Sequence, residues 1–76
     1  MREDAGGWAR AVRTWGQVVR LRPKEPDGWL ALARAQTKAG DGTAARTTLD
    51  TIRKTPWDER FGDVRAKADA LRKDVP

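Results

Sequence analysis

The sequence predicts an all-α chain, in which about four antiparallel helices form a right-handed stack of helical hairpins. The first observation is an internal repeat, because four positions near the start of the chain recur further along it. The two copies are Ala11, Trp15, Val18 and Pro23, and then Ala45, Leu49, Ile52 and Pro56. The shift is 34 residues for the first three positions and 33 for the proline. A period of this length is typical of hairpins that bury their apolar faces only against neighbouring hairpins.

The second observation is that the apolar residues of each segment recur in steps of three and four, which places them on one face of a helix. The first helix is expected over residues 5–21, because proline at position 23 disfavours helical geometry in the residue before it. Its apolar stripe consists of Trp8, Ala11, Val12, Trp15, Val18 and Val19.

The third observation is that helix-start and helix-stop residues separate the segments. A second helix is expected over residues 26–39, since Pro26 suits a first helical position and Gly40 a left-handed cap. Asp41 is expected to cap a third helix over residues 42–54.

A fourth helix is expected over residues 57–73, with Thr55 as its cap and Asp58 in a capping box. Its apolar positions form one narrow seam, and they are Trp57, Phe61, Val64, Ala68, Leu71 and Val75. Nearly all its other positions are charged, which is typical of a helix that covers the last apolar face of a stack. We expect Trp15, Leu32, Leu49 and Phe61 to share one interior.

Composition limits the function classes. The 76 residues are enough for one small domain, predicted over residues 1–76, and they include no cysteine and no histidine. We therefore expect no disulfide, no metal site, no cofactor and no catalytic residue, and we do not expect an enzyme. No apolar run approaches the roughly 20 residues that span a bilayer, and residues 1–4 lack a signal-peptide core. The compartment stays open: the cytoplasm is favoured, with the periplasm as the alternative if the chain is part of a longer envelope protein.

The net charge is +5, from 16 basic and 11 acidic residues. A basic balance attracts acidic proteins or nucleic acid. Because the acids and bases are interleaved, we favour a mixed, solvated surface. The same alternatives apply to the stripe of Arg10, Arg13 and Arg20 on the first helix, where no aromatic residue is interleaved for base stacking.

The second and third helices resemble the tetratricopeptide repeat. The residues that carry this resemblance are Trp29-x-x-Leu32-Ala33-x-x-Gln36, then Gly40-Asp41, then Ala45-x-x-x-Leu49, and finally Pro56. Residues 6–23 resemble the second half of a preceding repeat, residues 26–56 a full repeat, and residues 57–73 the helix that often ends such an array. The chain departs from the pattern at Gln36, where the family has an aromatic residue.

The resemblance implies a protein–protein interaction or scaffold module that binds a peptide or a partner subunit, which an acidic sequence would suit. It places the binding groove on one face of the second helix, at Asp27, Leu30, Arg34, Thr37 and Lys38. The chain contains no asparagine, so capture of a C-terminal carboxylate by asparagines is not expected. An ordinary solvated helix face is the alternative for these five residues.

The tryptophans separate into two groups. We expect Trp15, Trp29 and Trp57 in the core, and Trp8 half-exposed at the edge, available to a neighbouring repeat or subunit.

Because the first helix has no expected helix before it, two explanations are open. The chain is part of a longer array, or a second copy closes the open face. Weak nucleic-acid binding through the arginine stripe is a further alternative.

Overall fold

The computed structural model describes residues 5–75, and within them it contains helices and no strand. The α-helices are α1 (Ala5–Leu21), α2 (Pro26–Lys38), α3 (Gly42–Lys54) and α4 (Val64–Arg72), and a short 3₁₀ helix, η1 (Glu59–Phe61), precedes α4. The prediction of an all-α stack of helical hairpins is confirmed. Both predicted ends of the domain, residues 1–4 and residue 76, lie outside the described residues.

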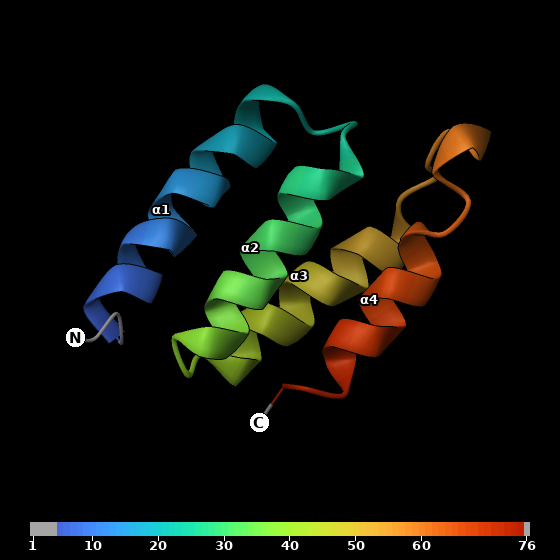
Figure 1. The fold of residues 1–76 in the computed structure, drawn as a ribbon. Helices are drawn as coiled ribbons and strands as arrows, with labels where there is room; N and C mark the ends of the chain where they lie inside the picture. Colours follow the sequence, from blue (N-terminus) through green and yellow to red (C-terminus); the bar gives the residue numbers. More distant parts are fainter. Residues whose placement is uncertain (1–4, 76) are drawn as a thin grey trace.

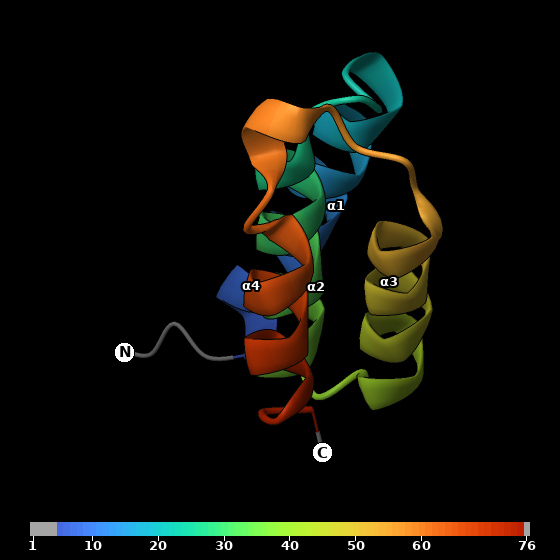
Figure 2. The ribbon, with the colours of Figure 1, turned by 90° about the vertical axis from the view of Figure 1, so that its right-hand side faces the viewer.

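Consecutive helices pack against one another as antiparallel neighbours. Figure 1 shows α1 and α2 side by side, with α3 behind α2 and α4 next to α3. The view turned by 90° (Figure 2) shows α1, α2 and α4 on one side of the molecule and α3 on the other. Helix α4 contacts both α3 and α2, so α2 lies at the centre of the stack.

Gly40 ends α2 and Asp41 caps α3, as the sequence predicted. Gly40 has φ +85°, a left-handed conformation that residues with a Cβ rarely adopt. This conformation lets the amide of Asp41 donate to the carbonyl of Gln36 at 2.9 Å, which closes the end of α2. The carboxylate of Asp41 then accepts a hydrogen bond from the amide of Ala44 at 3.1 Å and caps α3.

The predicted start of the fourth helix, at residue 57, is wrong, because α4 begins at Val64. The hydroxyl of Thr55 donates back to the carbonyl of Thr51 at 2.7 Å, so it ends α3 and does not cap a new helix. The indole N–H of Trp57 donates to the carbonyl of Ile52 at 2.8 Å and holds the chain against the end of α3. Asp58 caps only η1, by accepting from the amide of Arg60 at 3.1 Å.

The core lies where α2, α3 and α4 meet. Its buried members are Ala33, Leu49, Ile52, Val64 and Ala68, and the partly buried side chains packed against them include Trp29, Trp57 and Phe61. The prediction that Trp15 belongs to this interior is wrong, because its ring is only partly buried and lies outside the cluster. Among residues 7–21 of α1, only Val19 is buried, since α1 packs mainly against α2.

Two features bring α1 close to α2. A Cβ placed on Gly28 would lie 3.1 Å from Cγ1 of Val18 and 3.4 Å from Cγ1 of Val19, so the two helices approach closely at this glycine. In the same turn region, the indole N–H of Trp29 donates to the carbonyl of Pro23 at 3.0 Å. These contacts fix the position of α1 beside α2. Within residues 5–75, the remaining apolar surface of α1 has no neighbouring helix on its other side.

Candidate functional site

A groove of about 620 Å³ lies between α1, α2 and α4, and no residue of α3 lines it. Helix α2 forms its floor with residues of one face, and α1 and α4 form its two walls. We call this hollow the groove. It is formed by the three helices that Figure 2 shows on one side of the molecule, away from α3.

Three of the five residues predicted on the second helix line the floor, namely Asp27, Leu30 and Arg34. They lie at intervals of three and four residues and therefore share one face of α2. Thr37 and Lys38 do not line the groove. The hydroxyl of Thr37 donates to the carbonyl of Ala33 at 2.9 Å, and Lys38 is exposed at the last position of α2.

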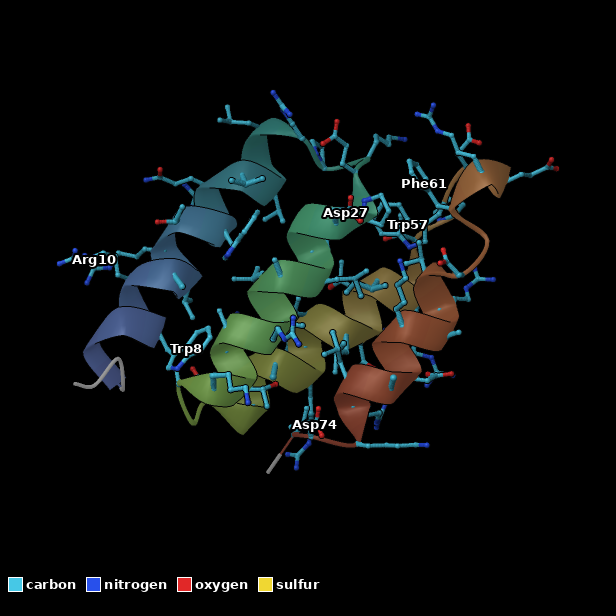
Figure 3. The ribbon with its side chains drawn as sticks, in the orientation of Figure 1. Trp8, Arg10, Asp27, Trp57, Phe61 and Asp74 are labelled. Atoms are coloured by element: carbon cyan, nitrogen blue, oxygen red, sulfur yellow. The ribbon has the colours of Figure 1, made fainter. Side chains whose placement is uncertain are left out.

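The wall from α1 carries two tryptophans, Trp8 and Trp15, both partly buried. Figure 3 shows the Trp8 ring projecting from α1 toward the C-terminal end of α2. Trp8 is thus placed where the sequence predicted, at the edge of the fold. Trp15 was missed as a groove residue, although its spacing of seven residues from Trp8 puts both rings on one helical stripe.

The wall on the side of α4 was missed altogether from the sequence, and its residues are Lys67, Ala70 and Leu71 of α4 and Asp74 just beyond the end of that helix. Only the packing of α4 against α2 brings these residues near the predicted ones, and no short-range pattern specifies that packing. The ammonium of Lys67 lies 3.2 Å from a carboxylate oxygen of Asp63 on the same side of the fold.

Charged groups alternate with apolar ones along the groove. Figure 3 places Asp27 near the N-terminal end of α2 and Asp74 at the opposite end of the molecule, and Arg34 lies between them along α2. Within residues 5–75, no side chain forms an ion pair with Asp27, Arg34 or Asp74. In this part of the chain, these three groups therefore keep their charges available to a ligand.

The predicted arginine stripe lies outside the groove. Arg10, Arg13 and Arg20 are exposed, and Figure 3 shows Arg10 extending from α1 away from α2. None of the three pairs with an acidic side chain in the described part of the chain.

Two smaller hollows, of about 260 and 130 Å³, flank the segment that contains η1, and both are lined by Trp57, Asp58 and Phe61. The guanidinium of Arg60 stands 4.8 Å from the centre of the Phe61 ring. In residues 5–75, no three acidic side chains gather in a way that could hold a metal ion. No helix there combines the length and the apolar character needed to cross a membrane.

Comparison with known proteins agrees with this geometry. The model of the tetratricopeptide repeat family matches residues 4–68. No curated protein and no solved structure was found to match the chain. Repeats of this family generally mediate protein–protein interaction and are typically not catalytic. Because the match covers most of the chain and the helices have the arrangement of stacked hairpins, the chain belongs to the tetratricopeptide repeat family.

Proposed function

We propose that the groove is a docking site for a protein partner, either a peptide or a segment of a folded subunit. The observation that carries this proposal is the composition of the groove. Two partly buried tryptophans and two leucines surround an arginine that has no ion-pair partner among residues 5–75. Apolar anchors in a concave surface supply binding free energy, and a few charged groups supply specificity.

The way the groove is built supports the same proposal. Its floor belongs to α2, which is held on one side by α1 and on the other by the core with α3 and α4. A surface fixed in this way loses little conformational entropy when a ligand binds, so more of the contact free energy appears as affinity.

Two alanines on α4 offer a matched test. Ala70 lines the groove, whereas Ala66, one helical turn earlier, does not, and both are exposed. The variants Ala70→Glu and Ala66→Glu therefore change the net charge equally and differ only in where the new side chain lies. Neither replaces a buried residue, so both are expected to fold.

The experiment selects binders from a phage-displayed library of random peptides on the immobilised protein. We expect the selected peptides to bind Ala66→Glu as tightly as the unchanged protein and to bind Ala70→Glu at least about tenfold more weakly. Equal weakening by both variants, or selected peptides that ignore both, would show that the groove is not the docking site.

A further inference from the structure

Four charged side chains line the groove, and three of them have no ion-pair partner in the described part of the chain. Lys67 lies 3.2 Å from a carboxylate oxygen of Asp63, so its charge is compensated within the protein. The other three are Asp27, Arg34 and Asp74, which are exposed and pair with no side chain of residues 5–75. Although the whole chain has a net charge of +5, these three groups leave the groove with two negative charges and one positive charge.

The three charges lie in the order negative, positive, negative along the groove. Asp27 lies in the first turn of α2, and Arg34 follows on the same face about two helical turns later, which is about 10 Å along the helix axis. Asp74 follows the end of α4, and Figure 3 shows it at the end of the molecule opposite to Asp27. A ligand that lies along α2 therefore meets a carboxylate first, a guanidinium next and a second carboxylate at the far end.

Apolar side chains separate these charges. Leu30 lies between Asp27 and Arg34 on the floor of the groove, and Leu71 of α4 lines one wall. Both leucines are only partly buried. A ligand that covers them brings an apolar side chain between its own charged ones, which removes this apolar surface from water.

We infer that the groove selects an extended peptide segment of mixed charge. The segment carries a basic residue opposite Asp27, an apolar residue over Leu30, an acidic residue opposite Arg34 and a second basic residue opposite Asp74. The inference rests on the proposed function and names the chemistry of its ligand. A uniformly acidic segment would bring carboxylates against both aspartates, and a uniformly basic one would bring a cation against the arginine, so the groove disfavours both.

The size of the groove sets the spacing of the ligand's charges. A helix of two turns, about 10 Å long and about 10 Å wide with its side chains, occupies roughly 800 Å³. This is more than the volume of the groove, which is about 620 Å³. An extended segment is thinner and advances about 3.3 Å per residue, so about three residues span the distance from Asp27 to Arg34. We therefore expect the basic and the acidic residue of the ligand about three positions apart.

Two matched pairs of protein variants test which charges select the ligand. Arg34→Glu reverses a charge inside the groove, and Lys38→Glu reverses one outside it, at the last position of the same helix. Asp27→Lys and Glu59→Lys form the second pair, since each replaces an acid in the first turn of a helix and Glu59 does not line the groove. All four side chains are exposed, so the variants are expected to fold, and thermal unfolding followed by circular dichroism verifies this.

The probe is the tightest binder among the phage-selected peptides, synthesised with a fluorescent label and measured by anisotropy against the full chain. We expect its sequence to contain a basic and an acidic residue about three positions apart, with an apolar residue between them. Arg34→Glu and Asp27→Lys should each weaken its binding at least about fivefold, and Lys38→Glu and Glu59→Lys by less than about twofold. A probe whose acidic residue is replaced by lysine should bind Arg34→Glu more tightly than the original probe does, because the two reversed charges attract each other.

The outcomes separate this inference from the proposed function. If Ala70→Glu weakens probe binding while Arg34→Glu and Lys38→Glu act alike, the groove binds a partner without recognising its charge, and only the inference is overturned. Selected peptides that are uniformly acidic or uniformly basic also overturn it, as does a gain of helical circular dichroism when the probe binds. If Ala70→Glu and Ala66→Glu act alike, the groove is not the docking site and both proposals fail. A concentration-dependent dimer in sedimentation, abolished by Ala70→Glu, would assign the groove to a second copy of the chain and contradict the inference.

Discussion

The hydroxyl of Thr48 on α3 donates a buried hydrogen bond of 2.6 Å to Oε1 of Gln36 on α2. Gln36 stands where the repeat pattern has an aromatic residue, and a smaller contact between the two helices is what the sequence alone indicates. The structure instead joins the helices by a polar contact inside the interface, with both residues buried. The register of α2 against α3 is therefore fixed by a directional bond as well as by apolar packing.

Because of this hydrogen bond, we predict that substitutions at Thr48 and Gln36 lower the free energy of unfolding by different amounts. Thr48→Val leaves the buried Oε1 of Gln36 without a partner and should lower the free energy of unfolding by about 1 to 2 kcal/mol. Gln36→Leu should cost less, because the Thr48 hydroxyl keeps the carbonyl of Ala44 at 3.0 Å. The double variant should be more stable than the sum of the two single changes indicates, as measured by urea unfolding. Simple additivity would mean that the bond contributes no coupling.

Alanine substitutions at two glycines should change the stability of the protein in opposite directions. Gly16 lies inside α1, and a Cβ added there would meet no neighbouring atom within 4 Å, so Gly16→Ala should stabilise the protein by about 0.5 to 1 kcal/mol. Gly40 has φ +85°, so Gly40→Ala should destabilise it by about 1 to 2 kcal/mol. Thermal unfolding of the two variants tests both signs. A stabilising Gly40→Ala would contradict the left-handed turn between α2 and α3.

Two leucines test where the core lies. Leu49 is completely buried among α2, α3 and α4, and Leu49→Ala should lower the free energy of unfolding by about 2 to 5 kcal/mol. Leu21, at the end of α1, is 81% exposed, and Leu21→Ala should change stability by less than about 0.5 kcal/mol. Urea titrations of both variants give the comparison. Similar losses at the two positions would contradict the exposed position of Leu21 at the end of α1.

The exposed arginines of α1 predict weak, unspecific binding of nucleic acid. At physiological salt, a DNA duplex should bind with a dissociation constant no tighter than roughly 10⁻⁶ M, because only phosphate contacts are available. Fluorescence anisotropy of a labelled duplex over a range of salt concentrations measures this. Tighter binding that falls steeply with salt and is lost in the Arg10→Ala, Arg13→Ala variant would give the arginine stripe a function of its own.

The sequence predicted those parts of the fold that depend on short-range chemistry. Gly40 and Asp41 mark the turn between α2 and α3 correctly, because their conformational preference and capping bond involve only adjacent residues. The predicted start of α4 was wrong because the hydroxyl of Thr55 can either cap a following helix or donate to a carbonyl at the end of the preceding one, and in the structure it donates to the end of α3. The spacing of apolar residues does not distinguish these two roles.

The candidate site was predicted on one helix only. The repeat spacing placed Asp27, Leu30 and Arg34 on one face of α2, and all three line the groove. Trp15 was assigned to the core, because a large apolar residue on a motif position normally has a neighbour on each side. The contributions of Leu71 on α4 and of Asp74 just after α4 depend on how α4 crosses α2, and this is a long-range property of the packing.

The four indole N–H groups provide the most direct measurement of the central claim, which is that a protein partner binds the groove. Trp29 and Trp57 already donate to the carbonyls of Pro23 and Ile52, whereas Trp8 and Trp15 line the groove. In a ¹⁵N-correlated spectrum titrated with one of the peptides selected on the immobilised protein, we expect the indole signals of Trp8 and Trp15 to move and those of Trp29 and Trp57 to stay. Movement confined to the signals of Trp29 and Trp57, or no movement of any indole signal at a saturating concentration of the peptide, would contradict the account.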